Sequence, residues 1–293
     1  MFELVKATER SYYIEAPAKI GIFKADGDDV YLIDSGNDKD AGRKVRKVLE
    51  QNGWNLKAIL NTHSNADHIG GNRYLQQQCG CRIFAPGMEA AFTRYPVLEP
   101  SLLYGGCPFK ELRHKFLMAS PSEAEDVTSP DFPKEIEILP LPGHFLDMAG
   151  YRMPDGTVFL ADCLSSKAAL DKYGITFIYD VGAYLETLHR VSSMQAELFV
   201  PSHAEAVRDI RPLAELNEKK VLEIVEQIKQ ICKMPQSFES ILRQVFTVYQ
   251  LRMNHEQYVL IGSTVRSYLA WLMDNGQICN YFEDNLLYWK TVC

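Results

Sequence analysis

Residues 62–71, with the sequence THSNADHIGG, constrain the fold more than any other stretch of the chain. An apolar run at residues 56–60 predicts a buried strand before it, and residues 72–78 predict the start of a helix after it. His63, Asp67 and His68 would each need a buried partner in a core, so we expect them to converge on a shared divalent metal. A polar loop that caps the helix through Asn65 or Asp67 is the alternative.

Ten residues of this stretch resemble the metal-binding motif of the metallo-β-lactamase superfamily, Thr-His-x-His-x-Asp-His-x-Gly-Gly. The chain departs from the motif at one ligand, because Asn65 stands where the family has its second His. Four more segments resemble family motifs and follow in the family's order: residues 31–36 (YLIDSG), 141–144 (LPGH), 159–162 (FLAD) and 200–203 (VPSH). Five ordered segments are far more specific than any one of them.

The resemblance implies an α/β fold, the αββα sandwich of two β-sheets flanked by helices. It also implies two metal positions and the residues that form them. The first metal position has His63, Asn65 and His144; the second metal position has Asp67, His68 and His203; and Asp162 bridges the two. Asp34 is the supporting carboxylate. The implied activity is hydrolysis by a metal-bound hydroxide, with Asp67 and Asp162 as catalytic carboxylates and zinc as the metal. Iron or manganese is the alternative metal.

Asn65 weakens this expectation at one position. An amide oxygen is a poorer zinc ligand than an imidazole, so the first metal position is expected to bind metal less tightly than the second. One tight metal, a harder metal at the first position and a degenerate inactive protein all fit this difference. The other six ligand positions are intact, which favours an active enzyme. Asn65→His is expected to complete the first position with little rebuilding of the loop.

The substrate is less constrained than the metal site. Asp162 at the bridging position resembles the thioesterase, lactonase and nuclease branches of the family more than the true β-lactamases. We therefore expect a small-molecule substrate with an ester-type bond, a thioester or a lactone. An endoribonuclease or phosphodiesterase and a catalytically dead metal-binding protein are the alternatives. The net charge of -7 argues against a broad surface that binds phosphates, so nucleic acid is disfavoured as a partner.

Two features predict a cytoplasmic protein. The seven cysteines are odd in number and irregularly spaced, which is typical of reduced thiols rather than a disulfide framework. The first residues lack the pattern of a signal peptide, and no window approaches the length of a membrane-spanning helix. We accordingly expect no membrane association.

Two regions lie outside the repeating strand and helix pattern. Residues 96–133 are rich in Pro and Gly, which excludes long regular elements, and their side chains Tyr104, Phe109, Arg113, His114 and Phe116 are candidate substrate contacts. Composition changes again near residue 210. We therefore predict a catalytic domain at residues 1–210 and a small, mainly helical domain at residues 211–293. Its three helices and final hairpin resemble a winged helix, and a homodimer through this domain is the expected partner interaction.

Overall fold

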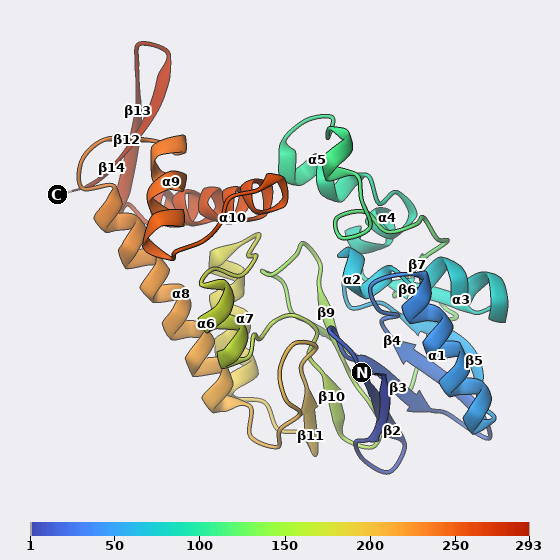
Figure 1. Ribbon diagram of the computed structural model, residues 1–293. Coiled ribbons are helices and arrows are strands. Elements are labelled where there is room, and N and C mark those ends of the chain that lie inside the picture. Colours follow the sequence, from blue (N-terminus) through green and yellow to red (C-terminus); the bar gives the residue numbers. More distant parts are fainter. Residues whose placement is uncertain (1, 293) are drawn as a thin grey trace.

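The computed structural model describes residues 2–292 as two β-sheets packed face to face, with helices on both outer sides and a helical C-terminal part (Figure 1). Seven strands form the first sheet in chain order: β1 (Glu3–Lys6), β2 (Ser11–Glu15), β3 (Ile20–Lys24), β4 (Asp29–Ile33), β5 (Asn55–Leu60), β6 (Arg82–Ala85) and β7 (Glu125–Asp126). Its first four strands are antiparallel and its last four are parallel.

Four strands form the second sheet in the order β11-β10-β9-β8. They are β8 (Glu137–Pro140), β9 (Ala149–Arg152), β10 (Thr157–Phe159) and β11 (Leu198–Val200). The helices between the strands are α1 (Lys39–Asn52), α2 (Ala66–Ile69), α3 (Asn72–Cys79), α4 (Met88–Arg94), α5 (Leu98–Tyr104), the 3-10 helix η1 (Lys110–Leu112), α6 (Lys167–Tyr173) and α7 (Val181–Ser192). The expected αββα sandwich is therefore confirmed.

Helix α1 illustrates how the sequence sets the outer layers. Asp38 caps its start by accepting a hydrogen bond from the backbone N–H of Ala41, and Gly53 ends it in a left-handed conformation. Its buried side chains Val45 and Leu49 pack in one cluster with Leu32 and Ile59 of the first sheet. A second cluster, which includes Phe23 of β3 and Phe159 of β10, fills the space between the two sheets. Each sheet is thus covered on both faces, as its apolar runs require.

The C-terminal part follows the predicted order of elements. It contains α8 (Arg211–Ile231), β12 (Gln236–Ser237), α9 (Phe238–Val248), α10 (His255–Asp274), β13 (Ile278–Glu283) and β14 (Leu286–Thr291). Its three strands form their own small sheet in the order β12-β14-β13, and β13 and β14 make the predicted hairpin. Within residues 2–292, the helices all lack the combination of length and apolar character that crossing a membrane requires.

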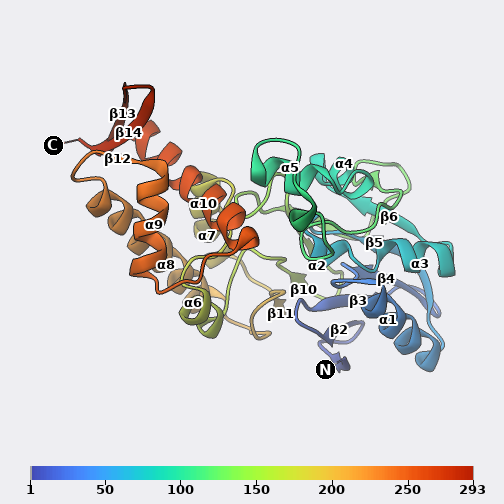
Figure 2. The ribbon, with the colours of Figure 1, turned by 45° about the horizontal axis from the view of Figure 1, so that its top comes forward.

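Residues 96–133 hold only short elements, as predicted, but they are not a free loop. Figure 2 shows α10 reaching across the molecule to α5. A small apolar cluster that includes Leu103, Leu112 and Val259 joins α5 and η1 to α10. Phe109 packs edge-on against His255, and His114 forms an ion pair with Glu256. Residues 96–133 therefore pack against α10 and hold the C-terminal part in place.

Candidate metal centre

The metal motif occupies the connection between β5 and α3, and it contains the short helix α2. Asn65 is the N-cap of α2, yet its side chain makes no capping hydrogen bond. The helix-capping alternative for Asn65 is therefore wrong. Gly70 and Gly71 are needed for close packing, because a Cβ at Gly70 would lie 2.2 Å from the backbone carbon of Asn37. The tight contact fixes the loop against the end of β4.

The remaining candidate ligands also follow strands. His144 comes after β8, Asp162 after β10 and His203 after β11. Gly143 precedes His144 with a φ of 120°, and a Cβ there would lie 2.3 Å from the backbone nitrogen of Tyr184. Ala161 has a φ of 52°, a left-handed conformation that is uncommon for a residue with a Cβ. Such backbone strain next to Asp162 is typical of functional sites.

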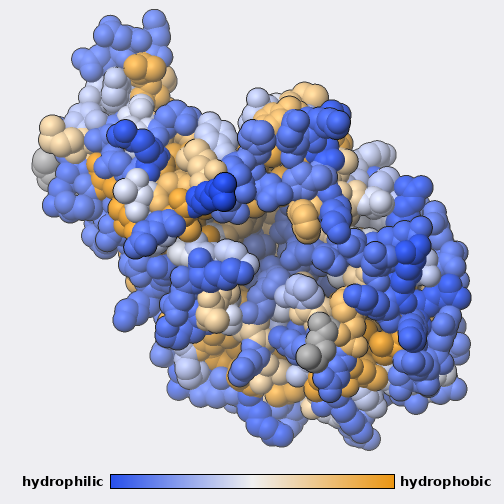
Figure 3. Space-filling model, in the orientation of Figure 1, coloured by the Kyte–Doolittle hydropathy of each residue, from blue (hydrophilic) through white to orange (hydrophobic). Residues whose placement is uncertain are grey.

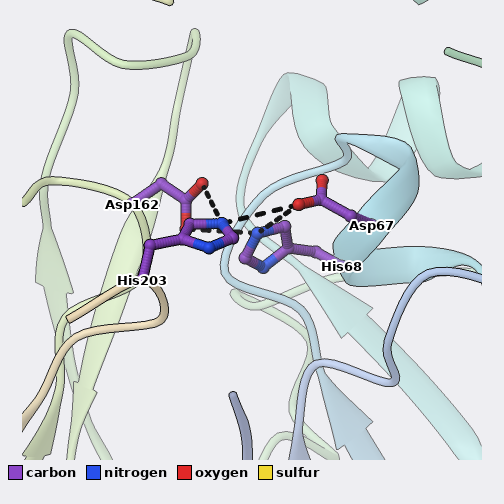
Figure 4. Close-up of side chains that lie close together, drawn as sticks. All are labelled: Asp67, His68, Asp162 and His203. Atoms are coloured by element: carbon purple, nitrogen blue, oxygen red, sulfur yellow. Dashed lines mark ion pairs between the residues drawn. The ribbon is translucent and has the colours of Figure 1, made fainter. Parts of the chain in front are cut away.

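These strand ends bring the side chains into two adjoining groups. Asp67, His68, Asp162 and His203 form one group, and His63, His144 and Asp162 form the other, with the ligand atoms of each group within 4.8 Å of one another. Figure 4 shows Asp162 and His203 meeting Asp67 and His68 from opposite sides. Asp162 lies 3.1 Å from Nε2 of both His68 and His203, and 3.8 Å from Nε2 of His144. Asp162 is therefore common to both groups, as a bridging ligand would be.

All four histidines are held through Nδ1. Nδ1 of His68 lies 2.8 Å from Oδ2 of Asp34. Nδ1 of His144 lies 3.0 Å from the Phe177 carbonyl oxygen, and Nδ1 of His203 lies 2.9 Å from the Pro17 carbonyl oxygen. In His63, Nδ1 lies 2.9 Å from the Thr62 hydroxyl, which itself donates to Asp34.

Carbonyl and carboxylate oxygens only accept, and the Thr62 hydroxyl already donates its hydrogen to Asp34, so each Nδ1 carries a hydrogen and each Nε2 points into the shared space. Metal-binding histidines are usually fixed in this way. Asp34, predicted as a supporting carboxylate, contacts His68 directly and Thr62 beside His63.

The chemistry of these atoms fits a divalent metal. Among the described residues, Nε2 of His63 is buried without a hydrogen-bond partner, and Nε2 of His68 and Oδ1 of Asp162 lie 3.1 Å apart without the geometry of a hydrogen bond. Burial lowers the pKa of His63 well below its usual value and also lowers the pKa of His144, so both imidazoles are neutral, as a metal ligand must be. Buried polar atoms without partners are costly, and a cation between them would remove that cost.

The group formed by Asp67, His68, Asp162 and His203 contains charged side chains. Burial opposes the charged form of His203, but Asp162 beside it dominates and raises the pKa of His203 to about 10. Asp162, also buried, has its pKa held well below the usual value by His203 and His68. Burial opposes the charged form of His68 as well, but Asp162 raises its pKa, so Asp162 stays ionised and holds protons on His68 and His203. A divalent cation would take the place of those protons, since metal binding at such a site releases them.

The sequence model of the metallo-beta-lactamase superfamily matches residues 17–203, which contain every candidate ligand. The chain belongs to the metallo-β-lactamase superfamily. The probable metallo-hydrolase YybB of Bacillus subtilis is 25% identical over 202 residues, covering 67% of this chain and 86% of that protein. A hydroxyacylglutathione hydrolase of Cereibacter sphaeroides is 26% identical over 174 residues, covering 59% of this chain but only 58% of its own length. The chain is thus a member of a superfamily of metallo-hydrolases.

Two solved structures share the fold over nearly the whole chain. A beta-lactamase domain protein from Burkholderia ambifaria has a TM-score of 0.76 at 15% identity, covering 99% of this chain and 94% of that one. A metallo-beta-lactamase family protein from Thermus thermophilus has a TM-score of 0.71 at 17% identity, covering 96% and 98%. Since these alignments extend over the C-terminal part, its arrangement relative to the metallo-β-lactamase sandwich is not peculiar to this chain.

Two buried glutamates beside the metallo-β-lactamase motif were missed by the sequence prediction. Glu89 of α4 accepts hydrogen bonds from the backbone and hydroxyl of Ser64, and burial raises the pKa of Glu89 to about 7. Glu99 of α5 accepts a hydrogen bond from Nδ2 of Asn65 at 2.8 Å. Neither belongs to a family motif, and each lies 25 or more positions from its partner. No local signal in the sequence could have found them.

A cavity of about 860 Å³ opens at the candidate metal centre. The surface in Figure 3 is hollowed between the part over α10 and the part over α2 to α5. Asp67, His144, Asp162 and His203 lie at one end of the cavity, and α6 and α10 supply other walls. The α10 side chains in the wall are Gln257, Leu260, Ile261 and Thr264. The candidate contacts predicted in residues 96–133 are not among the residues that line this cavity, and Phe109 and His114 pack on α10. Substrate contact by these side chains stays a prediction.

Proposed function

We propose that the protein is a metal-dependent hydrolase that cleaves an ester-type bond in a small molecule, with a thioester or a lactone favoured. One observation carries the proposal: four imidazole Nε2 atoms and the carboxylates of Asp67 and Asp162 converge at one end of a cavity large enough for a substrate. Clefts of roughly 300–1,000 Å³ are typical of small-molecule sites. Zinc is the proposed metal, because imidazole and carboxylate ligands suit it.

The two carboxylates have different roles in this proposal. A divalent cation supplies Lewis acidity and lowers the pKa of a coordinated water to about 7. Asp162 is buried between the two groups and keeps both sets of histidines at fixed distances. Asp67 is 44% exposed and lines the cavity, and only its Oδ2 is used in the contacts with His68 and His203. Its Oδ1 is left to accept a proton from attacking water and to return it to the leaving group.

Three observations favour a thioester or lactone over nucleic acid. Several matched relatives are named hydroxyacylglutathione hydrolases, although the chain spans less than two thirds of their length. The cavity wall contains apolar side chains of α6 and α10, such as Ala169 and Leu260, which suit an acyl group rather than a phosphate chain. The net charge of -7 also opposes binding of a polyanion. Phosphodiester cleavage is the second candidate, because the same ligand set serves it.

Metal analysis and a hydrolysis panel test the proposal. Purified protein is assayed by elemental analysis and then, with zinc added, on a glutathione thioester, an acyl lactone, a nitrocefin-like β-lactam and a model phosphodiester. We expect metal to co-purify, and thioester or lactone turnover that chelation abolishes and zinc restores. Asp162→Ala is expected to lower turnover by about 100-fold or more, because it removes the group common to both metal positions. The control is Asp171→Ala, which removes an exposed carboxylate of α6.

Three results would overturn the proposal. An empty centre after growth and soaking with zinc, iron and manganese would exclude a metallo-hydrolase. Metal binding without turnover on any ester would identify a catalytically dead member. Turnover confined to the phosphodiester, with RNA binding that weakens steeply with salt, would instead select the second candidate.

A further inference from the structure

Glu99 is a buried carboxylate whose burial needs an explanation. It lies in the first turn of α5 and is 5% exposed. Its one side-chain hydrogen bond among the described residues is accepted by Oε1 from Nδ2 of Asn65, at 2.8 Å. Burying a carboxylate costs free energy unless a hydrogen-bonding partner compensates for the lost water. The partner here is the one residue that departs from the family motif.

The Asn65 amide is held in a single orientation by its two neighbours. Nδ2 of Asn65 donates to Oε1 of Glu99, so the NH₂ group faces Glu99 and Oδ1 faces the other way. Oδ1 lies 3.1 Å from Nε2 of His144. Nδ1 of His144 lies 3.0 Å from the Phe177 carbonyl, which turns Nε2 of the ring toward Oδ1 of Asn65. Oδ1 and Nε2 therefore face each other beside His63 and Asp162, where a cation between them would contact both.

Resting on the proposed metal centre, we propose that Glu99 is a positioning residue that holds the Asn65 amide oxygen toward the first metal position. The pair of Asn65 and Glu99 then replaces the histidine that the motif has at position 65. Without Glu99, the amide would be free to rotate and present its NH₂ group, which cannot bind a cation. The hydrogen bond to Glu99 also polarises the amide toward its oxygen, much as hydrogen-bond acceptors beside metal-binding histidines raise the basicity of the ring.

Cobalt titration of three variants tests this role independently of catalysis. The metal-free protein is titrated with Co²⁺, and visible absorption and calorimetry report each metal position. Glu99→Leu is expected to weaken the first metal position by about 10- to 100-fold and to change its absorption bands. The second metal position, formed by Asp67, His68 and His203, should keep its affinity. Glu99→Gln should restore part of the loss, because its amide oxygen still accepts from Asn65 without the charge. Glu111→Gln, at an exposed glutamate of η1, is the control.

The outcomes separate this proposal from the proposed function. If the unmodified protein binds no cobalt, both are overturned. If it binds one ion only, or if both Glu99 variants bind two ions with unmodified affinity and spectra, the role of Glu99 is overturned and the metallo-hydrolase stands. Should Glu99→Leu fail to fold, the Glu99→Gln titration decides by itself, because a weakened first position alone supports the proposal and unchanged binding rejects it.

Discussion

At the scale of single residues, Asn65 and Glu99 must be considered together. In Asn65→His, the ring Nδ1 takes the place of Oδ1 and a carbon takes the place of Nδ2, so Glu99 loses its hydrogen-bond donor. We expect metal binding at the first position to tighten by about 10- to 100-fold, because imidazole is the stronger ligand. We also expect the metal-free variant to lose about 1–3 kcal/mol of stability, because a buried carboxylate is left without a partner. Cobalt titration and urea unfolding measure the two effects.

The double variant Asn65→His with Glu99→Leu is the control for this coupling. It should keep the tighter metal binding and recover most of the stability, since no unpaired carboxylate remains. A single Asn65→His variant that is as stable as the unmodified protein would contradict the coupling. The sequence alone predicts that this replacement needs little rebuilding. Glu99, 34 positions away along the chain, is the reason to expect otherwise.

The ligand positions of the site could be predicted from the sequence, but most of the residues that support them could not. The structure brings together all seven predicted ligand positions, because the motifs carry their own spacing and each follows an apolar strand; metal binding by them stays a prediction. Asp34 was predicted as a support from its motif. Glu89 and Glu99 could not be, because their roles depend on where short helices in a Pro-rich region pack, and packing of this kind leaves no periodic pattern in a sequence.

At the scale of elements, the strand at residues 56–60, the helix that starts at residue 72 and the three C-terminal helices with their hairpin were predicted, whereas α2, α5 and α6 were not. Helices of four to seven residues present no full amphipathic repeat, so tertiary contacts decide whether they form. Helix α10 shows the converse. Its presence as the last of three C-terminal helices was predicted, but its place as a wall of the cavity depends on its contact with α5 and α7, which no local pattern encodes.

The position of α10 predicts an effect on substrate binding. Leu260→Asp places a charge in the cavity wall, away from the candidate ligands. With the best substrate of the panel, we expect KM to rise about 10-fold while kcat and metal content stay nearly unchanged, because binding of a remote apolar group is lost equally in the ground and transition states. Steady-state kinetics at fixed zinc measure this. Met253→Asp, at an exposed residue before α10, should leave KM unchanged. An unaltered KM in Leu260→Asp would exclude α10 from the substrate site.

At the scale of the whole molecule, the predicted boundary at residue 210 separates two parts of the chain that share one core. A single apolar cluster includes Val158 of the second sheet, Leu188 of α7, Ile224 of α8 and Tyr268 of α10. The boundary is visible in the sequence because composition changes there. The shared core is not, because each helix looks amphipathic whether it packs on its own neighbours or on another domain.

Removal of residues 211–293 tests whether the sandwich of residues 1–210 folds independently. We expect residues 1–210 to aggregate or to melt at least about 10 °C lower than the full chain, since the faces of α7 and the second sheet that α8 covers would be exposed to water. Ile224→Asp, which charges the buried face of α8, should destabilise the full chain in the same direction. Leu222→Asp, on the exposed face of that helix, should not. Thermal unfolding and size-exclusion chromatography report both. A soluble, monomeric fragment of residues 1–210 that unfolds cooperatively at the temperature of the full chain would mean that the catalytic domain is independent, and that α8 to α10 only shape its cavity.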